Sequence, residues 1–135
     1  MRQALKGKIT VQAEAYLLLS LYLLLMPFQW VCAMILAGFI HELGHCTALY
    51  LLGEPILKIR IGPFGAKIET MPMEHQRTLL CALAGPAAGL LACLFWKWLP
   101  KIAFLAFMQS IFNLLPIFPL DGGRAFRALR QWTNG

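Results

Sequence analysis

The sequence predicts an all-α membrane protein with about four transmembrane helices and one small β-hairpin. Hydrophobic residues make up 59% of the 135 residues and charged residues only 13%, so the chain has more apolar surface than one small core could bury. Long uncharged runs alternate with short basic segments, a pattern typical of polytopic membrane proteins. A chain of this length is expected to form a single domain, residues 1–135.

The first uncharged run is too long for one membrane-spanning helix. Residues 15–40 carry no charge, and apolar character resumes after Glu42 and continues to residue 53. A single helix of this length would extend roughly 60 Å, about twice the hydrocarbon thickness of a bilayer. Pro27, followed closely by a tryptophan, predicts a turn at the interface. We therefore expect a first span over residues 12–27, retained as an anchor, and a second over residues 30–52.

Residues 56–70 change to the pattern of a β-strand. Apolar side chains alternate at Leu57, Ile59 and Ile61, and a Gly-Pro-Phe-Gly turn separates them from a second alternating segment. This pattern predicts a hairpin with these three side chains on one face. A two-stranded hairpin is marginally stable by itself, so we expect it to lie against the membrane or the helices.

Two further uncharged runs predict a third span over residues 78–97 and a fourth over residues 102–120, the latter interrupted late by two prolines. The third span contains Gly85 and Gly89 in a G-x-x-x-G arrangement, with Pro86 between them. Small residues at this spacing let another helix backbone approach closely. We expect them to serve packing, and they could also leave room beside a metal site.

The distribution of basic residues predicts the orientation in the membrane. With four spans, the N-terminal segment, the connector between spans two and three, and the C-terminal tail share one side, which carries ten of the twelve Lys and Arg residues. Only Lys97 and Lys101 lie on the other side. The positive-inside rule then places both termini in the cytoplasm of a multi-pass protein, and we expect the cell membrane as its location. The net charge of +6 is spread between apolar runs, so no nucleic-acid partner is expected.

A group of ionisable residues lies within the second predicted span, in the motif His41-Glu42-Leu43-Gly44-His45. On a helix the two imidazoles lie one turn apart on the same face, so they can share one zinc ion. Glu42 beside them can take a proton from a zinc-bound water. Each ionisable residue in the hydrocarbon region costs roughly 2.5–3.5 kcal/mol, so the presence of three such residues within five positions requires an explanation. The alternative is a polar cluster hydrogen-bonded to neighbouring helices.

A second polar signal follows the fourth predicted span. Asp121 comes directly after the proline-interrupted run, where its carboxylate can act as a metal ligand. Two imidazoles and one carboxylate leave zinc's fourth position open, as in catalytic sites. Alternatively, Asp121 is a membrane-surface carboxylate paired with an arginine. Gly122 and Gly123 are expected to let the chain leave the membrane abruptly. Asn113 either contacts substrate or ties two helices together.

The four cysteines show no Cys-x-x-Cys spacing and all lie in apolar segments. We therefore expect them to be small core residues rather than disulfides or thiolate ligands. Cys46 adjoins His45 but points about 100° away from it on a helix, so it is not expected to bind the same metal.

The two motifs together resemble those of the site-2 protease family, the intramembrane zinc metalloproteases. The second motif reads Asn113-x-x-Pro-x-x-Pro-Leu-Asp-Gly-Gly-Arg, and the resemblance covers about residues 12–124. It implies one zinc ion per chain, a water-activating carboxylate and a substrate contact. The residues that match these roles are His41, His45 and Asp121 for zinc, Glu42 for water, and Asn113 for substrate.

The resemblance implies hydrolysis of a peptide bond in or near a transmembrane segment. The implied substrate is a membrane-anchored protein in the lipid bilayer, and the implied role is regulated proteolysis. No PDZ-like insertion fits in residues 54–77, and the compact plan is most similar to the branch containing stage IV sporulation protein FB. A regulatory membrane partner or a homo-oligomer is left open. Two other classes compete: a catalytically silent scaffold and a metal-handling membrane protein. Retention of Glu42 with all three ligands speaks against the first, and the presence of one polar cluster against the second.

Overall fold

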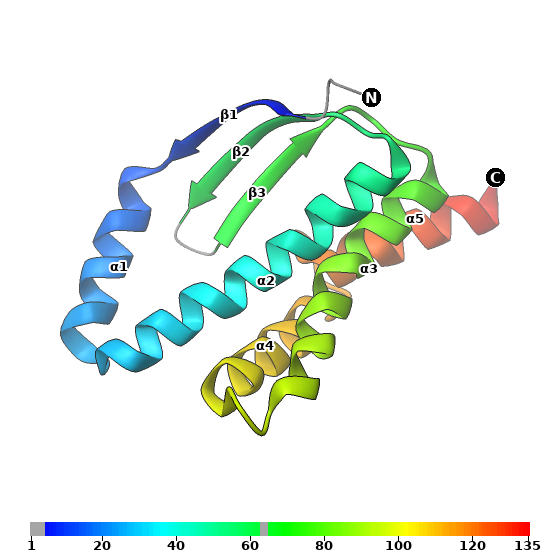
Figure 1. The fold of residues 1–135 in the computed structure, drawn as a ribbon. Coiled ribbons are helices and arrows are strands. Elements are labelled where there is room, and N and C mark those ends of the chain that lie inside the picture. The colour runs from blue at the N-terminus through cyan, green and yellow to red at the C-terminus, as the bar shows by residue number, and fades with distance from the viewer. Residues whose placement is uncertain (1–4, 63–64) are drawn as a thin grey trace.

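The computed structural model describes residues 5–62 and 65–135, which form a mostly helical fold with a small sheet (Figure 1). The elements in chain order are β1 (Leu5–Val11), α1 (Ala13–Leu25), α2 (Phe28–Leu52), β2 (Ile56–Gly62), β3 (Gly65–Thr70), α3 (His75–Ala92), a short 3-10 turn (Cys93–Phe95), α4 (Pro100–Asn113) and α5 (Asp121–Asn134). The sheet lies over one side of α2, and α3 packs against α2, α4 and α5.

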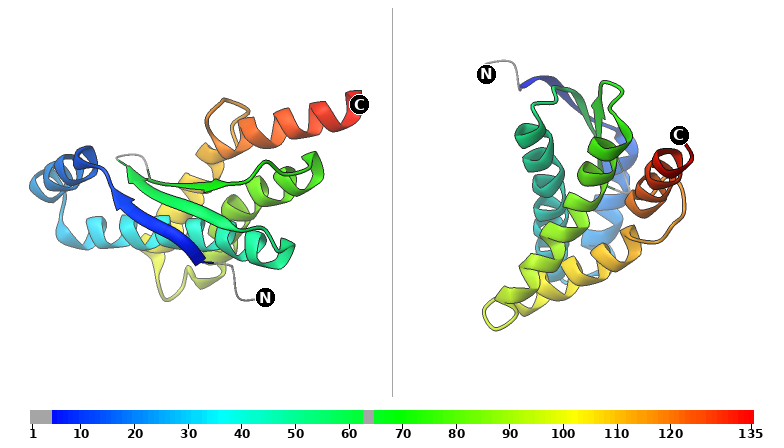
Figure 2. Two further views of the ribbon diagram at one scale, coloured as in Figure 1. Left: turned by 90° about the horizontal axis from the view of Figure 1, so that it is seen from above. Right: turned by 90° about the vertical axis from the view of Figure 1, so that its right-hand side faces the viewer.

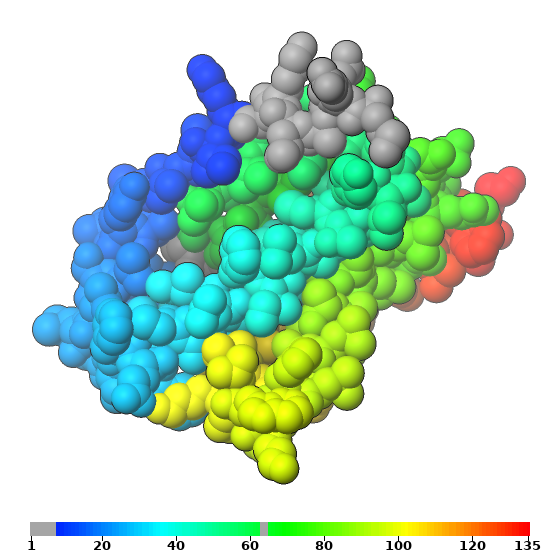
Figure 3. All heavy atoms as spheres, viewed as in Figure 1, coloured from blue at the N-terminus to red at the C-terminus, as the bar shows by residue number. Residues whose placement is uncertain are grey.

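The predicted turn at Pro27 separates α1 from α2, and the predicted starts and ends of these helices are correct within about two residues. Pro27 directly precedes the first residue of α2, where its fixed φ and missing N–H are tolerated. The helix ends at Gly53, whose φ of 71° is left-handed, a conformation that favours glycine. None of the residues of α1 is buried, and Figure 3 shows this helix along one side of the molecule.

The sheet contains one strand more than the predicted hairpin. β1 pairs in parallel with β2, and β2 pairs antiparallel with β3, so the order is β1-β2-β3 and β2 is central. No strand was predicted from the sequence before the first span at residues 12–27. The two lysines and one glycine in this stretch obscure its alternation, whereas pairing with β2 is a long-range contact that only the fold supplies. The predicted turn falls partly on residues 63–64, outside the described residues.

The predicted apolar face of the hairpin is wrong in detail. Leu57 is 50% exposed and Ile61 37% exposed, whereas the neighbouring Ile56 is 6% exposed. The pairing of β2 with β3 shifts register between Ile56 and Lys58, and such an irregularity redirects the side chains on either side of it. Ile56 thereby reaches a buried cluster with Leu49 of α2 and Cys81 of α3, which fixes the sheet on the helices.

Small residues line the interior of the helix bundle. Ala37 of α2, Ala92 of α3 and Ala106 of α4 form one buried cluster. Large apolar side chains point outward instead: Leu24 is 81% exposed and Leu51 77% exposed. Soluble cores have the opposite arrangement, whereas membrane helices associate through small residues.

Two helices among the described residues are long and apolar enough to cross a membrane. They are α2, with a mean hydropathy of 1.4, and α3 extended through Phe95, with a mean hydropathy of 2.0. α1 is also apolar but has 13 residues, and α4 has 14. The fold thus contains two candidate spans, fewer than the four predicted from the sequence.

The fourth predicted span, residues 102–120, is not one helix. α4 ends at Asn113, residues 114–120 are irregular, and the next helix begins at Asp121. Pro116 disfavours helical geometry in the residue before it, so the helix stops there. The bond between Phe118 and Pro119 is cis.

Gly122 and Gly123 both lie in the first turn of α5, and neither has a positive φ. Their value is close approach: a methyl group on Gly122 would collide with the backbone of Leu114, and one on Gly123 would lie 2.6 Å from the nitrogen of Phe118. The first turn of α5 therefore packs directly on the preceding loop. Figure 2 shows α5 beside α3, with which it shares an extensive contact.

Candidate metal centre

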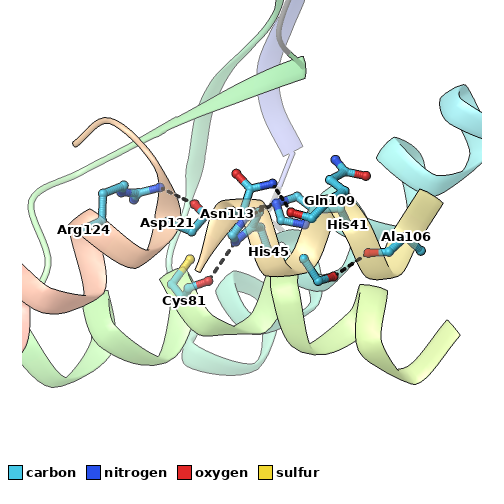
Figure 4. A network of polar contacts seen from close by, with 9 residues as sticks. His41, His45, Cys81, Ala106, Gln109, Asn113, Asp121 and Arg124 are labelled. Carbon is cyan, nitrogen blue, oxygen red and sulfur yellow. Dashed lines mark hydrogen bonds and ion pairs between the residues drawn. The ribbon is translucent and has the colours of Figure 1, made fainter. Parts of the chain in front are cut away.

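His41 and His45 project from one face of α2, as the four-residue spacing predicts, and both are buried at 5% and 7% exposure. Asp121, the first residue of α5, meets them from the opposite side and is 7% exposed. Its Oδ2 lies 2.9 Å from Nε2 of His41 and 3.0 Å from Nε2 of His45, and the two nitrogens are 3.2 Å apart. Figure 4 shows these side chains converging between the helices.

The hydrogen bond on the far side of His45 fixes the direction of its lone pair. Nδ1 lies 2.8 Å from the backbone carbonyl oxygen of Cys81, and a carbonyl only accepts, so Nδ1 carries the proton. In the neutral ring Nε2 is then a bare lone pair directed at the carboxylate of Asp121. Two acceptors face each other at 3.0 Å, an arrangement that favours a cation or a proton between them.

The three donor atoms fit a zinc ion. Tetrahedral coordination with bonds of about 2.0–2.1 Å separates two ligand atoms by roughly 3.3 Å, close to the observed 2.9–3.2 Å. Two imidazole nitrogens and one carboxylate oxygen are ligand types that zinc accepts, and three protein ligands leave the fourth position open. The donor group contains no cysteine from the described parts of the chain, and Cys46 lies outside it.

Asp121 also has a contact that the sequence analysis treated as an alternative to metal binding. Its Oδ1 lies 3.7 Å from Nη1 of Arg124, one turn further along α5, while Oδ2 faces the histidines. The carboxylate thus serves both interactions, each through a different oxygen. In the sequence, Arg124 was counted only among the ten basic residues on the predicted cytoplasmic side. Its three-residue spacing from Asp121 would have indicated the contact had α5 been predicted.

Glu42 is half-buried and stands outside the three-atom donor group. Its carboxylate lies near the start of β3: a methyl group placed on Gly65 would be 4.0 Å from Oε1 of Glu42. Gly65 has a φ of 119°, which side-chain-bearing residues rarely adopt. The first residue of β3 therefore approaches the carboxylate beside the donor group, and one end of the sheet lies next to the site.

Asn113 is the last residue of α4, and its Nδ2 donates to the carbonyl oxygen of Gln109 at 2.9 Å. This bond stays within one helix, so it does not tie two helices together. It uses one of the two N–H groups of the amide. The predicted contact between Asn113 and the substrate stays a prediction.

The sequence analysis missed the contribution of α3 to the site. The carbonyl of Cys81 is a backbone group, so no residue type in the sequence marks it. The other undetected feature is a buried atom, Nδ1 of His41, which has no hydrogen-bond partner among the described residues.

No family model matches the chain, but comparisons with curated proteins and with solved structures find similar proteins. A zinc metalloprotease of Methanocaldococcus jannaschii is 30% identical in an alignment of 112 positions that covers 71% of this chain and 32% of that protein. Stage IV sporulation protein FB of Bacillus subtilis is 28% identical in an alignment of 133 positions that covers 87% of this chain and 46% of that protein. The chain thus spans about a third to a half of these relatives.

The solved structure of a site-2 protease from Methanocaldococcus jannaschii has the same fold. It matches with a TM-score of 0.76 and 24% sequence identity, over 97% of this chain and 71% of the other. The shared fold, the two relatives and the two motifs at one buried site agree with the resemblance found in the sequence. The chain is similar to the site-2 protease family in its two motifs and in its fold.

Proposed function

We propose that this protein is an intramembrane zinc metalloprotease that hydrolyses peptide bonds in or near transmembrane segments of membrane-anchored proteins. The observation that carries the proposal is the convergence of three buried donor atoms, from α2 and α5, within a bundle whose outer surface is apolar. Buried ionisable groups in such a bundle are expensive and usually functional. The name of the Methanocaldococcus jannaschii relative, a zinc metalloprotease, and the fold shared with a site-2 protease support the same reading.

In this proposal His41, His45 and Asp121 hold one zinc ion per chain. Zinc at this position supplies a Lewis acid that polarises the scissile carbonyl and makes water acidic enough to attack at neutral pH. The carbonyl of Cys81 orients the imidazole of His45, and burial of all three side chains keeps competing water away.

Glu42 acts as the general base and then as the acid. Its carboxylate takes one proton from the attacking water, whose oxygen forms the new bond to the carbonyl carbon. When the carbon–nitrogen bond breaks, the same proton goes to the leaving nitrogen, so the products are one carboxyl and one amino terminus. Asn113 is proposed to donate to the substrate from the end of α4.

We further propose that the chain crosses the cell membrane four times with both ends in the cytoplasm. Large outward-facing leucines on α1, α2 and the turn after α3 support a lipid environment. α1 and α4 each extend about 20 Å, so they would cross the hydrocarbon region only with their flanking residues. Ten of the twelve basic residues lie on the proposed cytoplasmic side.

The topology predicts the location of reporters fused at successive points. Fusions after Met26, Met71, Lys97 and Gly135 should lie outside, inside, outside and inside, because each span reverses the side. Paired enzymes that are active only in the cytoplasm or only outside it make the measurement. An outside location for both Met71 and Gly135 would reverse the orientation, and any non-alternating order would rule out four spans.

Zinc ligation predicts the metal content of alanine variants. Purified protein should contain about one zinc per chain, and Asp121→Ala should lose most of it, as should His41→Ala and His45→Ala, because three-ligand sites lose affinity steeply with one donor. Elemental analysis of detergent-purified protein measures this. Arg127→Ala, on the same helix and without a contact to the donor group among the described residues, is the matched control and should retain the metal. Full zinc content in Asp121→Ala would remove Asp121 from the ligand set.

The role of Glu42 predicts a separation of metal binding from catalysis. Glu42→Gln preserves the shape of the side chain but cannot accept a proton, so zinc content should be normal while proteolysis falls by at least about a hundredfold. Cleavage of a membrane-anchored reporter substrate, followed by gel mobility, gives the rate. Cleavage by Glu42→Gln at the normal rate would assign the base to another residue.

Failure of the intact, zinc-loaded protein to cleave any membrane substrate would favour the catalytically silent scaffold. Loss of zinc to competing metals without any proteolysis would favour the metal-handling protein. A regulatory membrane partner and self-association belong to the same proposal, and co-purification from detergent distinguishes them.

The edge strand β3 is the proposed place where substrate becomes extended. Peptide bonds within a helix are shielded, so a protease must unwind them, and pairing with a free strand edge achieves this. Because β2 is central, β3 offers such an edge, and its first residue lies next to Glu42. Among the described residues, the sheet thus presents one unpaired edge of β3 beside the proposed catalytic carboxylate.

Proline substitutions test the edge of β3. Successive N–H groups point to opposite sides of a strand, so Ala66→Pro and Lys67→Pro remove one N–H each, one toward β2 and one toward the free edge. Neither side chain is buried. The variant that loses the N–H group facing the free edge of β3 should cleave substrate at least about tenfold more slowly, and its zinc content should be unchanged. Normal cleavage by both variants would limit the sheet to a packing role.

A further inference from the structure

The imidazole of His45 lies in contact with the backbone of α3 at Gly85. A methyl group built on Gly85 would lie 2.6 Å from Cε1 and 2.8 Å from Cδ2 of the ring, and closer still to Nε2. Real carbon atoms do not approach this closely, so any side chain at this position requires the ring or the helix to move. All three of the nearest atoms belong to His45. The ring therefore occupies the space that a side chain on residue 85 would fill.

The same helix also holds the other edge of the ring. The carbonyl of Cys81, one turn before Gly85, accepts the Nδ1 proton of His45 (Figure 4). Residues four apart share a helix face, so the hydrogen bond and the glycine contact come from neighbouring points on α3. The hydrogen bond to Cys81 fixes the rotation of the imidazole ring, and the contact with Gly85 fixes how closely the ring approaches α3. Together they leave Nε2 directed at Asp121, 3.0 Å away.

A second glycine makes the reciprocal contact from α2. A methyl group on Gly44 would collide with the carbonyl oxygen of Ala84 and lie 2.7 Å from the side chain of Ala88. Gly44 is next to His45 in α2, and Ala84 is next to Gly85 in α3. Each of the two helices therefore places a glycine at the point where they cross. The short separation of α2 and α3 is what brings the Cys81 carbonyl within reach of the imidazole.

The two glycines of the G-x-x-x-G pair on α3 have different partners. A methyl group on Gly89 would collide with Oγ of Ser110 and lie 3.1 Å from the carbonyl oxygen of Ala106, both in α4. Ser110 is fully buried and already bonded to Ala106, at 2.7 Å. Gly89 thus serves helix packing, whereas Gly85 contacts a member of the donor group.

We propose that Gly85 is a positioning residue for His45, and that its missing side chain holds the imidazole in the orientation that metal binding requires. The inference deepens the proposed function, since it depends on His45 being a zinc ligand. Gly85 supplies no donor atom to the group and acts through the ring of His45.

Matched glycine-to-alanine variants test this role through metal binding alone. Gly85→Ala should displace the ring and weaken zinc binding by roughly 10–100-fold, as loss of ligand orientation commonly does. Gly89→Ala, on the same helix, should retain wild-type zinc affinity, and adding Ser110→Ala removes its own collision. Competition with a chromogenic chelator measures affinity, and Co²⁺ absorption reports ligand geometry. Wild-type affinity and spectrum in Gly85→Ala would overturn the proposal.

A double-mutant comparison covers the outcome in which Gly85→Ala is too unstable for metal binding to be measured. Thermal unfolding is recorded with metal removed, for Gly85→Ala with His45 present and again with His45→Ala. If the collision is with the ring, alanine at 85 lowers Tm only when His45 is present. When the imidazole ring is absent, alanine at position 85 should be neutral or stabilising, because alanine has a higher helix propensity than glycine. An equal loss of Tm in both backgrounds would overturn the proposal.

The two measurements separate failure of this inference from failure of the proposed function. A wild-type protein that binds no zinc would refute metal ligation by His45, and with it the proposed enzyme. The unfolding comparison needs no metal and would still report whether Gly85 and His45 compete for the same space. Wild-type zinc binding together with equal losses of Tm would reject only the role of Gly85.

Discussion

The close crossing of α2 and α3 is the contact on which the rest of the structure depends. Gly44 and Gly85 remove side chains from this crossing, so the backbone of one helix lies against residues of the other. Both histidines come from α2, and the carbonyl that orients one of them comes from α3. α4 and α5 then pack on α3, and the sheet is held by Leu49 and Cys81, one from each helix of the crossing. A wider separation would disturb the site and the attachment of the sheet together.

The interior composition follows from the solvent on the outside. Lipid is as apolar as leucine, so burying large side chains gains little, and helices associate through close packing of small ones. The buried alanines on α2, α3 and α4 fit this rule, as does the outward position of many leucines. In such an interior the His41, His45 and Asp121 group is the main polar feature among the described residues. Its burial is tolerated because each member has a polar neighbour.

The sequence identified the residues with the clearest physical signature. The spacing of His41 and His45 implies a shared helix face, and Pro27 marked the break between two helices correctly. Features that arise only from tertiary contacts escaped prediction. β1 becomes a strand by pairing with β2 across two helices. The buried face of α5 consists mainly of small residues such as Ala125 and Ala128, so no large apolar side chains mark it in the sequence. The role of Gly85 also depends on which ring lies opposite, and spacing along the chain cannot show this.

The origin of the donor atoms has a consequence for biosynthesis. Two of them are present as soon as α2 forms, but the third follows 76 positions later, at the start of the last helix. A nascent chain that has inserted its first three helices therefore carries an incomplete donor set. It gains the third donor only when α5 docks against α3. The order of residues along the chain thus delays assembly of the donor group until α2, α3, α4 and α5 have packed together.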